Sequence, residues 1–135
     1  MFFIGDRWLK LAAISLDPGQ STTLIGDWLQ FRLVMNPGIA FSLPLRGDWL
    51  TILLSLIIAA LFFVIIYLTL KKKANYWTPL LLTVILFGAI SNILDRYIYG
   101  AVIDYLDLKY FSIFNIADAM ISSGVIILVW RKWRR

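Results

Sequence analysis

The fold class is decided by one uncharged stretch of the sequence, Trp49-Leu-Thr-Ile-Leu-Leu-Ser-Leu-Ile-Ile-Ala-Ala-Leu-Phe-Phe-Val-Ile-Ile-Tyr-Leu-Thr-Leu70. A helix needs about 20 predominantly apolar residues to cross the hydrocarbon core of a bilayer, and this stretch is long enough. The rest of the chain agrees, since 61% of its 135 residues are hydrophobic, where soluble domains have roughly 45–50%. We therefore predict a membrane-spanning helix over residues 49–70.

Two further stretches are predicted to span the membrane. Residues 77–96 carry no charge before Asp95, and residues 111–130 contain a single charge, Asp118. Each of the three spans has a tryptophan at one end, where aromatic side chains commonly sit at the membrane interface. The three stretches predict three transmembrane helices.

The basic residues form two clusters that set the expected topology. Lys71-Lys72-Lys73 follows the first span, and Arg131-Lys132-Trp133-Arg134-Arg135 follows the third. Such clusters mark cytoplasmic ends by the positive-inside rule, so we expect a cytoplasmic C-terminus and place residues 95–110 outside. Because the formal net charge of +5 is concentrated in clusters of this kind, we expect no nucleic-acid partner.

The first third of the chain differs from the spans. Residues 21–46 alternate loosely between polar and apolar residues and reach a turn signal at Asn36-Pro37-Gly38, which predicts a small β element on or near the bilayer surface. Residues 1–16 are too short for a full span and carry charges, so we expect a truncated first helix. The predicted fold is an all-α integral membrane protein with a single membrane-embedded domain over residues 1–135. It would consist of three clear transmembrane helices, the truncated N-terminal helix and a small extracytoplasmic β element.

The residue inventory removes most catalytic options. The chain has no cysteine, histidine or glutamate, which excludes disulfides, thiol nucleophiles, serine–histidine triads and the usual zinc ligands. Eight aspartates are the only side-chain carboxylates, so acid–base chemistry falls to Asp, Lys, Tyr or Ser. We expect no metal and no cofactor.

Two of these aspartates lie at the same predicted membrane face. Asp104 falls in the outer connection, and Asp118 opens the third span. Taken singly, Asp104 could be a solvated loop acid and Asp118 an acid favoured by a helix N-terminus. Two carboxyl groups brought close together share a proton, so one can activate water while the other donates to a developing oxyanion. Their joint placement favours a membrane-embedded aspartyl hydrolase.

A polar cluster closes the second span. Asn92, Asp95 and Arg96 are spaced i, i+3 and i+4, so they share one face of a helix. They could form an interfacial helix end with a local Asp–Arg pair, or they could position groups in the site.

Five sequence blocks, in order, resemble the lipoprotein signal peptidases (signal peptidase II) of bacteria. The blocks are Asp6-Arg-Trp-Leu-Lys10, Asn36-Pro-Gly38-Ile-Ala40-Phe41-Ser42, Gly88-Ala-Ile-Ser-Asn92-Ile-Leu-Asp95-Arg96, Val102-Ile-Asp104-Tyr105 and Phe114-Asn115-Ile-Ala117-Asp118. Four features depart from the family pattern, and the most serious is the truncated first helix. Ser91 replaces a glycine, Arg7 replaces a glutamine, and the connection between the two acids looks shorter.

The resemblance implies a four-helix membrane peptidase with a β-cradle, which removes the signal peptide of a diacylglyceryl-modified prolipoprotein just before its lipidated cysteine. It implies that Asp104 and Asp118 are catalytic. The implied substrate-binding residues are Asn36, Gly38, Asn92, Arg96, Asn115, Asp6 and Lys10, and the implied structural supports are Asp95, Gly88 and Ala117. The expected partners are the lipid-modified prolipoprotein and membrane lipid. The expected setting is a monomer in the bacterial inner membrane, with its active site near the outer leaflet.

Two other functions are compatible with a small membrane protein. A proton-coupled transporter would need an ionisable residue deep within a span, and here the acids lie at the ends of the predicted spans. A non-enzymatic membrane adaptor would use the paired Asn and Asp residues only as helix caps.

Overall fold

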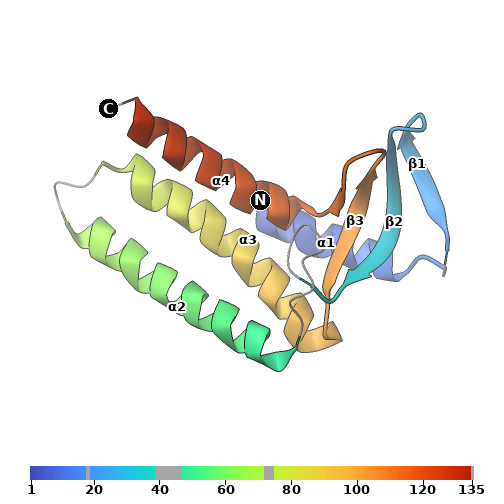
Figure 1. Ribbon diagram of the computed structural model, residues 1–135, viewed down its shortest axis with the longest axis horizontal. Helices are drawn as coiled ribbons and strands as arrows, with labels where there is room; N and C mark the ends of the chain where they lie inside the picture. Colours follow the sequence, from blue (N-terminus) through green and yellow to red (C-terminus); the bar gives the residue numbers. More distant parts are fainter. Residues whose placement is uncertain (18, 39–46, 72–74, 135) are drawn as a thin grey trace.

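The computed structural model describes residues 1–17, 19–38, 47–71 and 75–134. Its elements are α1 (Phe2–Ile14), β1 (Ser21–Ile25), β2 (Leu29–Asn36), α2 (Asp48–Leu70), α3 (Trp77–Tyr99), β3 (Val102–Leu108), β4 (Ile113–Phe114) and α4 (Ile116–Trp133). The helices α2, α3 and α4 lie side by side, and α3 packs against both others. The sheet lies beyond the ends of these helices, on the right in Figure 1. The fold is mostly helical with a small antiparallel sheet, as predicted.

Two helices of the described residues, α2 and α3, are long and apolar enough to cross a membrane, with mean hydropathies of 2.9 and 1.8. Only 6% of the most apolar window of α2 is buried inside the protein, so its apolar surface is left for lipid. Helices α2 and α3 thus cover the stretches predicted at 49–70 and 77–96. Helix α3 continues slightly further, to Tyr99, and ends at Gly100, whose φ of 74° is the left-handed conformation that glycine favours at a helix end.

The prediction of a helix over residues 111–130 is wrong at its start. Ile113–Phe114 is strand β4, and the helix α4 begins only at Ile116. The reason is Asn115, whose side-chain oxygen accepts a hydrogen bond of 2.8 Å from the backbone N–H of Asp118 and so caps the first turn. Asp118 therefore lies in the first turn of α4, next to the sheet.

The four strands form one antiparallel sheet in the order β1-β2-β3-β4. Strand β2 pairs with β3, which places Val34 opposite Asp104. The segment that carries Asp104, placed in the connection between the second and third spans, is a central strand of the sheet. Asp104 is buried there, so the alternative of a solvated loop acid is wrong. Strands β1 and β2 fall within the predicted β element at 21–46, of which 39–46 lie outside the described residues.

Helix α1 is held against the rest of the protein by apolar and polar contacts. Ala13 packs with Ile103 and Tyr105 of β3, and all three side chains are wholly buried. Asp6 and Lys10 of the same helix are also wholly buried. Buried charges are costly unless they are paired, so the position of α1 depends on the partners described below.

Candidate active site

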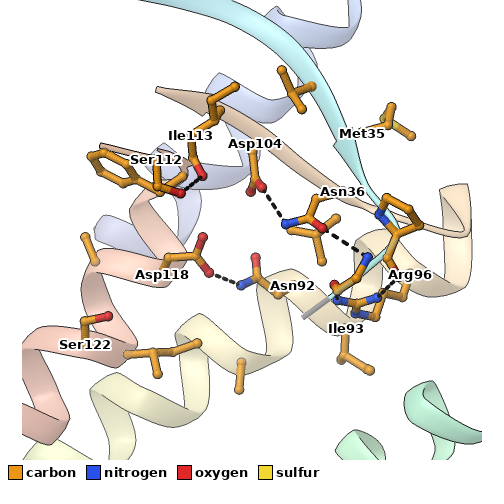
Figure 2. Close-up of a pocket in the computed structure, with 18 of the residues that line it drawn as sticks. Met35, Asn36, Asn92, Ile93, Arg96, Asp104, Ser112, Ile113, Asp118 and Ser122 are labelled. Atoms are coloured by element: carbon orange, nitrogen blue, oxygen red, sulfur yellow. Dashed lines mark hydrogen bonds between the residues drawn. The ribbon is translucent and has the colours of Figure 1, made fainter. Parts of the chain in front are cut away.

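A cleft of about 1100 Å³ opens where the sheet meets the helices. Asp104 enters it from β3 and Asp118 from α4, and Figure 2 shows both carboxyl groups turned toward the same space. Asn36, Asn92 and Arg96 line the same cleft. Its remaining walls are mainly apolar and include Leu54, Ile57 and Ile58 of α2 and Ile121 of α4. The structure thus brings the two predicted acids together at one largely apolar cleft.

The carboxyl group of Asp104 is fixed by two side-chain amides. Asn115 Nδ2 donates to its Oδ1 at 2.7 Å, and Asn36 Nδ2 donates to its Oδ2 at 3.0 Å. The Asn36 amide is itself oriented by Gly38, whose backbone N–H donates to Asn36 Oδ1 at 3.0 Å. Both oxygens of Asp104 are therefore hydrogen-bonded, although only 2% of the residue is exposed.

A third amide connects the two acids. Asn92 Nδ2 donates to Asp118 Oδ1 at 2.7 Å, while Asn92 Oδ1 accepts from Asn115 Nδ2 at 3.2 Å. Because Asn115 also donates to Asp104, an unbroken series of amides runs from one carboxyl group to the other. This network holds both acids in fixed positions at the cleft.

Burial and the neighbouring acid change the ionisation of Asp104. Burial in the protein, and secondly the negative charge of Asp118, raise the pKa of Asp104 to about 7, against the opposing effect of the amide hydrogen bonds from Asn36 and Asn115. A carboxyl group with this pKa can be protonated or ionised near neutral pH. The pair therefore suits chemistry in which one proton is shared.

Arg96 holds the chain at the end of β2. Its two terminal nitrogens donate to the backbone oxygens of Pro37, at 3.3 Å, and of Gly38. The local pair between Asp95 and Arg96, one of the two alternatives from the sequence, is wrong, because Asp95 is bonded to α1 instead. Arg96 shapes the rim of the cleft through the turn that carries Asn36.

The structure places Asp6 and Lys10 beneath the cleft, where both are wholly buried. Lys10 Nζ lies 3.1 Å from Asp6 Oδ2 and 2.7 Å from Asp95 Oδ2. Asp95 is also bonded to Arg7 and accepts from the backbone N–H of Ile103 at 3.2 Å. Two acidic and two basic side chains thus join α1 to α3. Because Asp6 and Lys10 are buried within this cluster, their geometry favours a role in supporting the site over contact with a substrate.

Gly88 and Ala117 lie at a close approach of α3 and α4. A Cβ atom on Gly88 would stand only 2.6 Å from the backbone oxygen of Ala117. The backbone N–H of Ala117 donates to Asp6 Oδ1 at 3.1 Å. The two residues expected as structural supports therefore fix the start of α4, where Asp118 lies.

The sequence analysis missed or undervalued two residues that support the site, Tyr105 and Ser91. Tyr105 donates its hydroxyl to Asp6 Oδ1 at 2.8 Å and accepts from the backbone N–H of Ile116 at 3.1 Å. Ser91 donates its hydroxyl to Asp6 Oδ2 at 2.6 Å, so it does more than fill the space of a glycine. Neither residue has a local signal, since its partners lie far away in the sequence. The unusual serine in an otherwise matching block was the one available hint.

Fold and site together define a class of protein, a membrane-embedded enzyme built around two carboxyl groups. The family model described as signal peptidase (SPase) II matches residues 1–134, so the chain belongs to the signal peptidase II family. This membership makes it an aspartic peptidase of lipoprotein precursors.

Curated relatives and solved structures agree with this assignment. The lipoprotein signal peptidase of Polynucleobacter necessarius is 32% identical over 96% of this chain and 81% of its own length. The enzymes of Rhodococcus jostii and Streptomyces coelicolor are each 34% identical, over 88% and 97% of this chain, and the matches cover 61% and 64% of those longer proteins. A bacterial membrane enzyme solved by the in meso method superposes with a TM-score of 0.85 at 25% identity, over 98% of this chain and 83% of that chain. A second one has a TM-score of 0.78 at 26% identity, over 96% and 86%.

Proposed function

We propose that this chain removes signal peptides from diacylglyceryl-modified prolipoproteins, cutting just before the lipidated cysteine, with Asp104 and Asp118 as its catalytic pair. The observation that carries the proposal is the placement of two buried, amide-linked carboxyl groups at one apolar cleft. Family membership supplies the reaction class.

The reaction follows from a shared proton. The ionised member of the pair takes a proton from water as the water oxygen attacks the scissile carbonyl carbon. The neutral member donates a hydrogen bond to the oxygen on which negative charge develops. Collapse of the tetrahedral intermediate breaks the C–N bond, and the nitrogen of the new N-terminal cysteine takes up the proton. The side chains that hold the pair in place are already ordered in the structure, so little reorganisation is needed.

The lining of the cleft suggests how a lipidated substrate is held. Asn36, Asn92 and Arg96 supply polar groups at its rim, and Gly38 lies beside them with its oxygen held by Arg96. The apolar wall made by α2 and α4 can receive acyl chains. Asn115, Asp6 and Lys10 are wholly buried, so we assign them to support of the pair.

The membrane arrangement is also a proposal. Charge clusters after α2 and in the last turn of α4 favour a cytoplasmic C-terminus, with the sheet and cleft at the outer leaflet of the inner membrane. In this arrangement α4 is the third span. The chain would work as one domain and as a monomer in contact with membrane lipid.

The test uses the chain purified in detergent, with a diacylglyceryl-modified peptide and its unmodified twin. We expect cleavage of the lipidated peptide alone. Asp104→Asn and Asp118→Asn should each lower kcat by at least about 100-fold, because each removes one partner of general acid–base catalysis. Asp27→Asn, in the exposed turn between β1 and β2 and outside the cleft lining, is the control and should stay active. Turnover retained in both catalytic variants would refute the peptidase mechanism. Proton-coupled export would instead support a transporter, and loss of a partner complex without loss of cleavage would support an adaptor.

A further inference from the structure

A buried ammonium group lies behind the amide that holds Asp118. Lys10 Nζ is 2.8 Å from Asn92 Oδ1, 2.7 Å from Asp95 Oδ2 and 3.1 Å from Asp6 Oδ2. An ammonium has three N–H donors and no acceptor, so these three oxygens can engage all of its donors. The two carboxylates fix two of its bonds. Asn92 Oδ1 and Ser91 Oγ, the latter at 3.3 Å, remain for the third donor, and Asn92 is the nearer of the two.

The bond from Lys10 is the shorter of the two that Asn92 Oδ1 accepts, and it is the main contact that orients the Asn92 amide. The other comes from Asn115 Nδ2 at 3.2 Å, which shares its two N–H groups with Asp104 and the backbone oxygen of Ile103. The two ends of a side-chain amide have nearly the same shape but opposite hydrogen-bonding roles. With Oδ1 on the ammonium of Lys10, the NH2 group points to Asp118 and donates at 2.7 Å. In the opposite orientation, the NH2 group would face the ammonium and the amide oxygen would face the carboxyl group. Both of those contacts are repulsive when Asp118 is ionised.

The other two amides of the site are oriented in the same manner, but by backbone groups. The N–H of Gly38 holds Asn36 Oδ1 at 3.0 Å, and the N–H of Asp118 holds Asn115 Oδ1 at 2.8 Å. In both cases the NH2 end is left to donate to Asp104. Lys10 does for Asp118, from a side chain, what backbone donors do for Asp104.

We propose that Lys10 is a positioning residue for the catalytic pair: it locks the Asn92 amide with its NH2 group toward Asp118. An ionised Asp118 then always meets a hydrogen-bond donor, whereas an amide held only by the longer bond from Asn115 would present its oxygen part of the time. This inference rests on the proposed function, since it assigns a role within the same reaction. It replaces the substrate contact that the sequence suggested for Lys10.

The test needs a background in which the buried charges stay balanced. Asp6, Arg7, Lys10 and Asp95 carry two negative and two positive charges, and removal of Lys10 alone would leave an excess buried carboxylate. Asp6→Asn combined with Lys10→Met keeps this cluster neutral. Asp95 retains Arg7 and the N–H of Ile103.

A double-mutant cycle separates the role of Lys10 from packing. We would measure kcat and KM on the lipidated peptide for wild type, Asp6→Asn/Lys10→Met, Asn92→Ala and the triple variant, all of which keep the charges of the cluster balanced. All are assayed below the lowest melting temperature, so that unfolding does not enter kcat. The paired change Asp6→Asn/Lys10→Met should lower kcat by roughly 10- to 100-fold with KM nearly unchanged when Asn92 is present, the effect of losing a hydrogen bond to a charged group. In the Asn92→Ala background the same change should alter kcat by less than about threefold, because the amide it orients is gone.

Three results would overturn one or other proposal. An equal fall in kcat in both backgrounds would mean that Lys10 acts through packing. A rise in KM with kcat unchanged would indicate direct contact with the substrate. A folded wild-type protein that does not cleave the lipidated peptide would instead overturn the proposed function itself, together with the role in that reaction assigned to Lys10.

Discussion

Asp104 shows how the environment of one side chain links activity to stability. Burial first, and then the charge of Asp118, raise the pKa of Asp104 to about 7. A carboxyl group with a higher pKa in the folded than in the unfolded chain binds more protons when folded. Its contribution to the free energy of unfolding therefore falls as the pH rises from about 4 to about 7, and then levels off.

We expect Asp104→Asn to flatten the pH dependence of the melting temperature in detergent between pH 5 and pH 8, since the variant cannot ionise at this position. Thermal unfolding followed by circular dichroism would measure it. Asp107→Asn is the control, because its carboxylate is paired with Arg32 on the partly exposed face of the sheet. The same slope in wild type and in Asp104→Asn would contradict the raised pKa.

The guanidinium of Arg96 joins two adjacent backbone oxygens, those of Pro37 and Gly38. Arg96→Lys keeps the charge but loses the fork geometry, so we expect kcat/KM on the lipidated peptide to fall by roughly 10-fold or more. Arg32→Lys, on strand β2 in a partly exposed ion pair, should stay near wild type. Equal activity of Arg96→Lys and wild type would show that the fork geometry is not needed.

At the scale of elements, the close approach of α3 and α4 depends on glycine. A Cβ atom on Gly88 would meet the Ala117 oxygen at 2.6 Å and Ile121 Cγ1 at 2.9 Å. Gly88→Ala should therefore force the helices apart, with a loss of about 1–3 kcal/mol in the free energy of unfolding. Since Ala117 precedes Asp118, we also expect lower kcat. Denaturation in detergent and cleavage of the lipidated peptide would measure the two effects.

Gly5→Ala is the matched control for this prediction. Gly5 is also a helical glycine, in α1, and a Cβ atom there would meet nothing within 4 Å. Alanine has the higher helix propensity, so the control should be neutral or slightly stabilising. A similar loss in both variants would mean that the contact between α3 and α4 is not the cause.

At the scale of the whole molecule, one hydroxyl group joins three elements. Tyr105 of β3 donates to Asp6 of α1 and accepts from the N–H of Ile116 in α4, and its side chain is wholly buried. Tyr105→Phe leaves these two buried groups without that partner, so we expect a loss of roughly 1–3 kcal/mol in the free energy of unfolding. Tyr76→Phe, on an exposed ring, should change it by less than about 0.5 kcal/mol. Equal stability of Tyr105→Phe and wild type would contradict the structural role of the hydroxyl.

The sequence predicted the membrane-facing part of the fold well and the sheet poorly. Helices α2 and α3 follow from long uncharged stretches, which are a local property of the chain. Strand β3 was missed because its partner β2 is distant in the sequence, and strand pairing of that kind leaves no local pattern. The start of α4 was misplaced because the cap at Asn115 was read as part of an apolar run.

Composition and motif order by themselves determined the membrane class, the absence of cysteine and histidine chemistry, and the choice of Asp104 and Asp118 as candidate catalytic residues. Only the tertiary structure decided that these acids share one cleft, and that Lys10 lies beneath it with Asp6 rather than at its surface. The physical reason is that apolar periodicity acts over neighbouring residues. The pairing of buried charges and amides instead depends on which distant segments the fold brings together.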